Sequence, residues 1–367
     1  MENSLKKKGF VVGMVLLFLA LVLISLSRND AMAAEKKVFN WKFSSHTTPG
    51  SKSLAPCQIW WCEQVEKRSN GQIKIKMYWV DELNGPKEMM MAVKSRLADV
   101  VGHTPGYTPG ETPIMNSTYL PFIWPPRVDQ TMVAYERLAK ESKPFIAEMD
   151  KFNCLYAGAY EHSGYNMMGK KPVRTVNDLK GLRVRVMTDL GEILKQFGAV
   201  TMLVPVTEMY SALDTGIVDV LTHDRLAFHA YKIDEISKYL MVNMDMGAAP
   251  TLYFINKDAW NELPGDLKKV VQSVIDELPA FIWDYHLRPD RNEEAEKTIK
   301  ERGIEVIHFP KGERTKLEAK AEGQWEMWAK RTPNYENAKR ALADYIRIRN
   351  EVVAKYPEGV PGIKYKK

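Results

Sequence analysis

The chain has 367 residues, of which 45% are hydrophobic and 27% charged, and its formal net charge is +6 at pH 7. Hydrophobic content of this size is typical of a globular chain and excludes intrinsic disorder. The basic residues are scattered, and no run of them is interleaved with aromatic residues, so we expect no nucleic-acid partner. The mild positive charge favours anionic ligands.

The N-terminus has the pattern of a secretory leader. Three lysines at 6–8 precede an apolar run over 10–26, and an Ala-Met-Ala site follows at 31–33. This order predicts a signal peptide over residues 1–33, cleaved near Ala33/Ala34, and hence a periplasmic protein that does not insert into the membrane after cleavage. An uncleaved anchor stays open as an alternative, because the run is close to the roughly 17-residue lower limit of a spanning helix.

The remaining 334 residues (367 − 33) favour two lobes over one at roughly 100–200 residues per domain. From residue 38 onward, period-two strands alternate with helical patterns and Gly or Pro turns. We expect strands at 38–45, 72–79, 98–102, 154–161, 250–256 and 304–309, with strand–helix units between 184 and 220. Helices are expected at 52–68, 86–95, 145–150 (its last part), 267–301 (broken by Pro279 and Pro289), 312–331 and 337–355, the last two capping the second lobe.

Three cysteines are present, at positions 57, 62 and 154. Cys57 and Cys62 lie five residues apart on different faces of an expected helix, so they should not pair easily. No further cysteine or histidine stands at metal-ligand spacing, and we expect buried cysteines, no metal site and no cofactor.

Residues 171–219 carry the strongest signal. A Pro-Val turn at 172–173 leads into a short strand on which Arg183 and Arg185 alternate, and two further strand–helix units follow, each marked by glycine. Strands that alternate with helices predict a mostly parallel sheet, and such sheets bind ligands at the carboxyl ends of their strands. An arginine there offers a planar fork for a carboxylate.

This stretch resembles the solute-binding subunits of tripartite ATP-independent periplasmic (TRAP) transporters, in the dicarboxylate-binding-protein (DctP) family. The matching motifs are Pro-Val, Asp-Leu-Lys-Gly, Arg-Val-Arg, Gly-Ala, a Glu-x-Tyr-x-Ala-Leu helix and Gly-Ile-Val-Asp, at 172–173, 178–181, 183–185, 198–199, 208–213 and 216–219. Further likeness at 71–78, 98–100 and 256–264 extends the resemblance over most of residues 38–330.

The resemblance implies a periplasmic binding protein-like α/β fold with two α/β lobes, a cleft and a long helix packing across both. We place lobe I at 34–160 plus 250–288 and lobe II at 161–249 plus 289–367. The implied function is capture of an organic acid in the cleft and its delivery to the small and large membrane subunits of a TRAP permease, without an ATPase.

The implied site centres on Arg185, which aligns with the arginine that clamps the substrate carboxylate in the family. Arg183 aligns with a family lysine and is expected near the exposed start of the strand. His223 stands where the family has a ligand-binding asparagine. A second family arginine has no counterpart here, and the passage offers Glu161, His162, Tyr165 and Asn166 instead, which suits a hydroxylated or amino-bearing acid. We expect the first lobe to contribute His46, His103 and Tyr107.

We expect no enzyme, because the chain has no phosphate loop, nucleophile elbow or paired metal-spacing histidines. Glu161–His162 and His223–Asp224 are sequence neighbours, and neighbours on a strand point to opposite faces, so we expect neither pair to form a dyad. A periplasmic sensor module on the same fold and the binding subunit of an ATP-driven importer stay open as alternative functions.

Overall fold

The computed structural model describes residues 37–360, except 126, 163, 248–249 and 288. The chain divides into two units, residues 1–39 and 40–367, and the account that follows concerns the second. The expected signal peptide lies outside the described residues. Within the described part, no helix combines the length and the apolar character that crossing a membrane requires.

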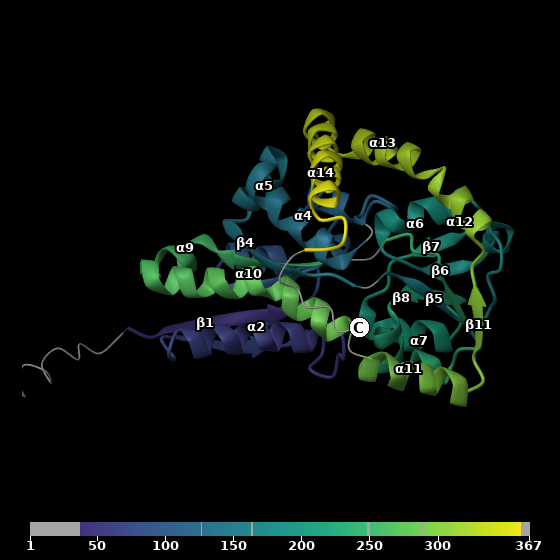
Figure 1. The fold of residues 1–367 in the computed structure, drawn as a ribbon, viewed down its shortest axis with the longest axis horizontal. Helices are drawn as coiled ribbons and strands as arrows, with labels where there is room; N and C mark the ends of the chain where they lie inside the picture. The colour runs from purple at the N-terminus through teal and green to yellow at the C-terminus, as the bar shows by residue number, and fades with distance from the viewer. Residues whose placement is uncertain (1–36, 126, 163, 248–249, 288, 361–367) are drawn as a thin grey trace, which may run out of the picture. The chain divides into compact units, whose positions relative to one another are not determined.

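The first sheet has five strands in the order β2-β1-β3-β10-β4 (Figure 1). β1 runs parallel to β3, with Ser45 opposite Gly102, so the loops that follow both strands leave from one edge of the sheet. β10 runs antiparallel to β3 and β4 and brings the chain back into this sheet. The strands are β1 (Phe39–Ser45), β2 (Ile73–Tyr78), β3 (Val100–His103), β4 (Cys154–Tyr160) and β10 (Thr251–Asn256).

The second sheet has six strands in the order β11-β9-β5-β8-β6-β7 (Figure 1). The parallel neighbours β7, β6 and β8 form the core of the predicted strand–helix units. β5 runs antiparallel to both β8 and β9, and the sequence had predicted neither β5 nor β9 as a separate strand. The strands are β5 (Asn166–Gly169), β6 (Arg183–Arg185), β7 (Val200–Met202), β8 (Val220–His223), β9 (Tyr239–Val242) and β11 (Glu305–His308).

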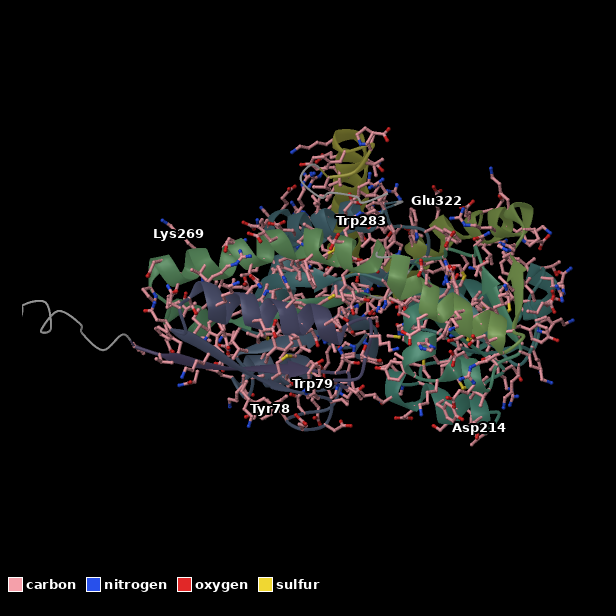
Figure 2. The ribbon with its side chains drawn as sticks, turned by 60° about the horizontal axis from the view of Figure 1, so that its bottom comes forward. Tyr78, Trp79, Asp214, Lys269, Trp283 and Glu322 are labelled. Carbon is pink, nitrogen blue, oxygen red and sulfur yellow. The ribbon has the colours of Figure 1, made fainter. Side chains whose placement is uncertain are left out.

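Helices pack around both sheets, and charged side chains such as Asp214, Lys269 and Glu322 are exposed (Figure 2). The helices up to residue 261 are α2 (Ala55–Arg68), α3 (Met89–Lys94), α4 (Val128–Glu141), α5 (Lys143–Lys151), α6 (Thr188–Lys195), α7 (Met209–Asp214), α8 (Arg225–Ala230) and α9 (Lys257–Asn261). Short 3-10 turns are η1 (Pro105–Tyr107), η2 (Met115–Tyr119), η3 (Val176–Leu179), η4 (Val206–Glu208) and η5 (Ile233–Glu235).

The predicted long helix forms two segments, α10 (Gly265–Leu287) and α11 (Pro289–Glu301). α10 packs against α2, α4 and β4 of the first lobe, whereas α11 packs against α8 of the second, so the pair contacts elements of both lobes. The expected break at Pro279 is wrong, since α10 continues through this proline. Pro289 begins α11, where its missing N–H leaves no helical hydrogen bond unmade.

The C-terminal helices are α12 (Lys311–Glu318), α13 (Ala321–Arg331) and α14 (Tyr335–Lys355). α14 does not cap the second lobe as the sequence predicted. Its buried residues Ala338, Ala341, Tyr345, Ile348 and Val352 recur every three or four positions, which makes one apolar stripe. The stripe joins the hydrophobic core that α4 and α5 build on the first sheet.

Candidate ligand-binding site

Arg185 is the last residue of β6 and is only 1% exposed. Its Nε donates to the carbonyl oxygen of Val204 (2.9 Å) and its Nη1 to that of Thr222 (3.0 Å), while Nη2 contacts the sulfur of Met187 (3.7 Å). Among the residues that the structure describes, no carboxylate forms an ion pair with Arg185. A buried cation held only by neutral groups is costly, so this position favours an anion.

Arg183 has a different role, although it precedes Arg185 by only two residues. Its Nη2 and Nε donate to the two carboxylate oxygens of Asp219 at 2.7 and 3.1 Å, and this partner, with Lys171, holds the pKa of Asp219 well below its usual range against the effect of burial. Arg183 therefore ties β6 to the start of β8.

Arg185 lines a small cavity between elements of the two sheets. Of the predicted site residues, the cavity brings together His46 and Tyr107 from the first lobe with Tyr165, Arg185 and His223 from the second. Its volume is ≈ 30 Å³, on a scale where one water molecule needs roughly 10–15 Å³. The segments that follow the carboxyl ends of β1, β3, β6 and β8 supply most of the residues that line the cavity, as expected for sheets whose ligands bind at this edge.

The first-lobe wall is built around His46, which follows β1. Its Nδ1 lies 3.1 Å from the carbonyl oxygen of Gly102 and its Nε2 lies 3.3 Å from the hydroxyl of Thr104. Burial lowers the pKa of His46 to about 4, so the ring is neutral at pH 7. Nδ1–H then donates to the carbonyl and Nε2 accepts from the threonine.

Two hydrogen bonds join the lobes beside the cavity. The hydroxyl of Tyr107 accepts from the backbone N–H of Val206 (3.3 Å), and the hydroxyls of Thr47 and Tyr231 are 2.7 Å apart. Met187, Val206 and Tyr231 also line the cavity, and none of them was predicted from the sequence. Met187 could have been found from its place two residues after Arg185, whereas nothing in the local sequence marks Tyr231.

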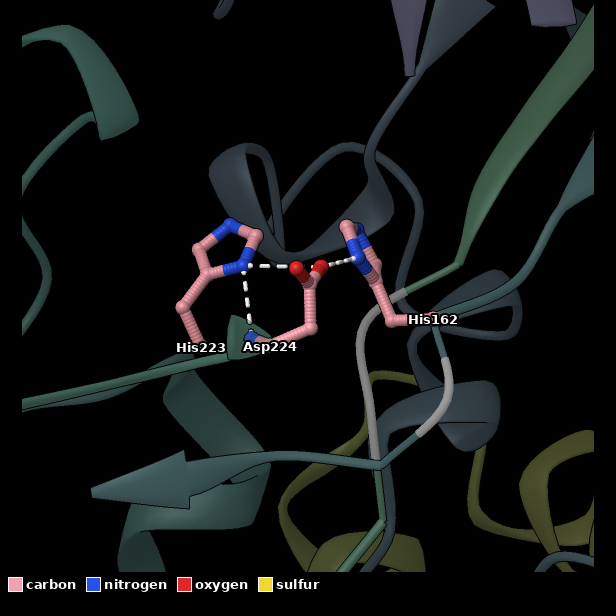
Figure 3. Close-up of side chains that lie close together, drawn as sticks. All are labelled: His162, His223 and Asp224. Atoms are coloured by element: carbon pink, nitrogen blue, oxygen red, sulfur yellow. Dashed lines mark hydrogen bonds and ion pairs between the residues drawn. The ribbon is translucent and has the colours of Figure 1, made fainter. Parts of the chain in front are cut away.

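The second-lobe wall contains a cluster that we call the His–Asp–His cluster: His162, His223 and Asp224 (Figure 3). Oδ2 of Asp224 lies 3.2 Å from Nδ1 of His223 and also bonds Nδ1 of His162. Burial lowers the pKa of His223 to about 4, with Asp224 opposing the shift. Although burial alone would raise the pKa of Asp224, the two histidines hold it well below its usual value.

The cluster corrects the expectation that His223 and Asp224 point apart. β8 ends at His223, and Asp224 is already the N-cap of α8, where its Oδ1 accepts from the N–H of Ala227 (2.7 Å). The period-two rule does not hold across this strand end, so the carboxylate turns back toward the His223 ring.

The other predicted residues lie outside the small cavity. Glu161 follows β4, and its carboxyl group accepts from the hydroxyl of Tyr135 (2.6 Å) and the N–H of His162 (2.9 Å); burial raises its pKa to about 8. It lines a second cavity of ≈ 460 Å³, which shares His162 with the first. Asn166 begins β5 opposite His223, and His103 packs in the first-lobe core near the hydroxyls of Thr108 and Thr112.

The three cysteines are buried, as expected. Burial raises the pKa of the Cys62 and Cys154 thiols, so both are protonated at neutral pH and neither is disposed to act as a nucleophile.

Two α/β lobes, with a cavity between them at the carboxyl ends of their parallel strands, define a binding protein of the periplasmic type. The chain matches the family model of bacterial extracellular solute-binding proteins, family 7 (DctP), over residues 45–331 and belongs to that family. This confirms the predicted family and class of function. Its members are the binding proteins of transporters and act outside the cytoplasm together with membrane permeases.

Two curated relatives illustrate the likeness. The chain is 25% identical over 247 residues to the 2,3-diketo-L-gulonate-binding periplasmic protein YiaO of Escherichia coli K12, which covers 66% of this chain and 73% of that one. It is 25% identical over 285 residues to the C4-dicarboxylate-binding periplasmic protein DctP of Rhodobacter capsulatus, with 76% and 80% covered.

Solved structures show the same fold. A TRAP solute-binding protein from Rhodoferax ferrireducens T118 in complex with copurified benzoate has a TM-score of 0.76 at 20% identity, covering 87% of this chain and 99% of that one. A marine metagenome TRAP solute-binding protein from an unidentified microbe, in complex with 3-hydroxybenzoate, has a TM-score of 0.75 at 22% identity, with 87% and 99% covered.

Proposed function

We propose that this chain captures a small organic acid in the cavity between its lobes, with Arg185 holding the carboxylate, and delivers it to the small and large subunits of a TRAP permease. The observation that carries the proposal is a buried guanidinium without a carboxylate partner among the described residues. Each hydrogen bond from this guanidinium to a carboxylate contributes roughly 1.5–3 kcal/mol. Benzoate and 3-hydroxybenzoate, named with two structural relatives, are acids of this kind.

The lobes close over the acid. We take lobe I as 34–160 plus 250–288 and lobe II as 161–249 plus 289–367, with α14 reassigned to lobe I by its packing on α4 and α5. Contacts that cross between lobes then include Tyr107 to Val206, Thr47 to Tyr231, and Lys52 to Glu294 (2.9 Å). Since the acid contacts both walls only when these contacts form, its binding energy stabilises the closed arrangement.

Specificity beyond the carboxylate comes from neutral hydrogen-bonding groups around the cavity. His46, Tyr107, Tyr165 and His223 surround Arg185, and they provide hydroxyl and imidazole groups rather than a second cation. This composition supports a ligand with one carboxylate and an additional hydroxyl, keto or amino group. Residues 1–33 direct the chain to the periplasm and are cleaved near Ala33/Ala34.

A thermal-shift screen over mono- and dicarboxylates, hydroxy acids, keto acids and aromatic acids tests the proposal. An acid at 100 times its dissociation constant adds about 2.7 kcal/mol to the free energy of unfolding. Arg185→Ala should abolish the shift produced by every hit. Arg183→Ala, which removes a guanidinium from the same strand, should keep most of it. An undiminished shift in Arg185→Ala would place the anion site elsewhere.

A further inference from the structure

The His–Asp–His cluster has the composition of a metal site. One donor atom from each of His162, His223 and Asp224 can be chosen so that all lie within 4.8 Å of one another, and all three side chains are buried. Figure 3 shows the two imidazole rings on either side of the carboxylate, each with Nδ1 facing it. Two imidazoles and one carboxylate form the ligand set found in many zinc and iron(II) sites.

Hydrogen bonds within the protein cannot satisfy every atom of this cluster, because Nδ1 of His223 faces both an acceptor and a donor. Nδ1 of His223 faces the carboxylate of Asp224 at 3.2 Å and the backbone N–H of Asp224 at 2.9 Å. If Nδ1 is protonated, its N–H points at the backbone N–H of Asp224. If Nδ1 is unprotonated, its lone pair points at the carboxylate oxygen. One contact is therefore repulsive in either state. A cation between Nδ1 and the carboxylate would use the lone pairs of both groups. Binding should lengthen the contact to the backbone N–H.

The donors are held in place by neighbouring groups, as metal ligands usually are. Oδ1 of Asp224 is fixed by the N–H of Ala227, which leaves Oδ2 to face the imidazoles. The ring of His162 packs edge to face with Tyr160 and Tyr165, at centroid distances of 4.7 and 5.5 Å. This packing orients the ring toward a donor that lies 62 residues away along the chain.

The cluster also has an accessible side. Both imidazoles line the cavity that contains Arg185, so an ion held by the three side chains would face the position of the bound carboxylate. Three protein ligands with one open position characterise zinc sites that accept an external ligand. Imidazole nitrogen favours zinc and other transition ions, whereas Ca²⁺ and Mg²⁺ require mainly oxygen ligands.

We propose that His162, His223 and Asp224 bind one divalent transition-metal ion, with Zn²⁺ as the representative, beside the carboxylate position at Arg185. The ion site does not depend on the proposed organic-acid function, because its three ligands are complete without the acid. When an acid is bound at Arg185, a hydroxyl, keto or amino group on it can occupy the open position of the ion.

Isothermal calorimetry of the purified protein, titrated with ZnCl₂ at pH 7, tests the site without any organic acid. We expect saturable binding of one Zn²⁺ per chain, and Co²⁺ in its place should give the visible absorption bands of a four-coordinate nitrogen and oxygen site. His162→Gln and His223→Gln should each weaken binding at least about 100-fold, since loss of even an outer-shell partner costs 10–100-fold. Ca²⁺ and Mg²⁺ should not compete.

Two control variants test whether Zn²⁺ binds at this cluster and whether its binding is independent of the acid site. His308→Gln removes an exposed histidine on β11 and should leave the affinity for Zn²⁺ unchanged. Arg185→Gln should keep Zn²⁺ binding, so that failure of the acid site and failure of the ion site give different results. Circular dichroism verifies that each variant is folded. The proposal is overturned if the folded wild-type protein binds no Zn²⁺ saturably, or if both cluster variants bind it as the wild type does.

Discussion

The hydroxyl groups of Thr47 and Tyr231, separated by 184 residues in the chain, lie 2.7 Å apart where the two lobes meet. Thr47 belongs to the loop after β1, and Tyr231 follows α8 of the other lobe. Because the hydrogen bond between them forms only while the lobes are in contact, we expect it to couple ligand affinity to lobe closure.

We predict that Thr47→Val and Tyr231→Phe each weaken the binding of an acid identified in the thermal-shift screen by about 5- to 10-fold, the equivalent of about 1 kcal/mol for a neutral hydrogen bond. The double variant should lose little more than either single variant, because the two groups serve one interaction. Isothermal calorimetry on the four proteins measures the coupling. Fully additive losses would show that the two hydroxyls act independently of each other.

Tyr107→Phe should weaken binding as well, because it removes the hydroxyl that accepts from the N–H of Val206. The ring remains to pack edge to face against His46 at 5.7 Å, so the fold should be retained. Small-angle scattering at saturating acid should show a larger share of open molecules than in the wild type. Tyr78→Phe, on β2 and outside the cavity lining, is the matched control and should behave as the wild type.

The contribution of Glu161 to stability should fall as pH rises from about 5 to 8. Burial raises the pKa of Glu161 to about 8, whereas an unfolded glutamate titrates near 4.3. Between these values the folded chain binds the extra proton, so the unfolding free energy decreases with pH by up to about 1.4 kcal/mol per unit. Denaturant unfolding at a series of pH values should give a shallower decrease for Glu161→Gln. The exposed Glu322→Gln is the control, and an identical decrease in wild type and Glu161→Gln would refute the assignment.

Acidification should destabilise the chain through its buried histidines. Burial lowers the pKa of His103 to about 3 and that of His223 to about 4, whereas histidine in an unfolded chain titrates near 6.5. The unfolded chain therefore binds more protons below pH 6.5, and the contribution of these groups is lost as pH falls toward 4. His103→Asn should reduce this acid sensitivity, and His308→Asn should not. Glu161 makes the unfolding free energy decrease as pH rises, whereas the buried histidines make it decrease as pH falls. A single pH series therefore tests both predictions.

Ile348→Ala on α14 should lower the free energy of unfolding by about 2–5 kcal/mol, the usual range for removal of a buried aliphatic side chain. Ile348 is completely buried in the core that α14 shares with α4 and α5. Met327→Ala on α13, where the side chain is 54% exposed, should change stability by less than about 0.5 kcal/mol. Equal small effects would mean that α14 is not part of the first-lobe core.

The parts of the fold that depend on local patterns were predictable from the sequence. The alternation around Arg183 and Arg185 and the glycines near 198 and 216 predicted β6, β7 and β8 in their parallel arrangement. The difference between the two arginines was only partly predictable, because the partner of Arg183, Asp219, is 36 residues away and its pairing depends on the register of β6 and β8.

The parts that depend on long-range packing were not predictable. His162 and Asp224 meet because the chain passes from β4 into the second lobe beside the N-terminus of α8, and no spacing rule brings residues 62 positions apart together. The stripe on α14 indicated an amphipathic helix, but amphipathicity does not specify which of two cores receives the apolar face. Tyr231 reaches the cavity from the end of a short helix whose sequence carries no binding signal.

The small volume around Arg185, ≈ 30 Å³, has a consequence for exchange kinetics. At roughly 10–15 Å³ per water molecule, this space has room for only a few waters, so an organic acid can enter or leave only when the lobes separate. The dissociation rate is then set by the frequency of opening rather than by the strength of the contact at Arg185 alone. A membrane partner that pulls the lobes apart would accelerate release without ever touching the guanidinium.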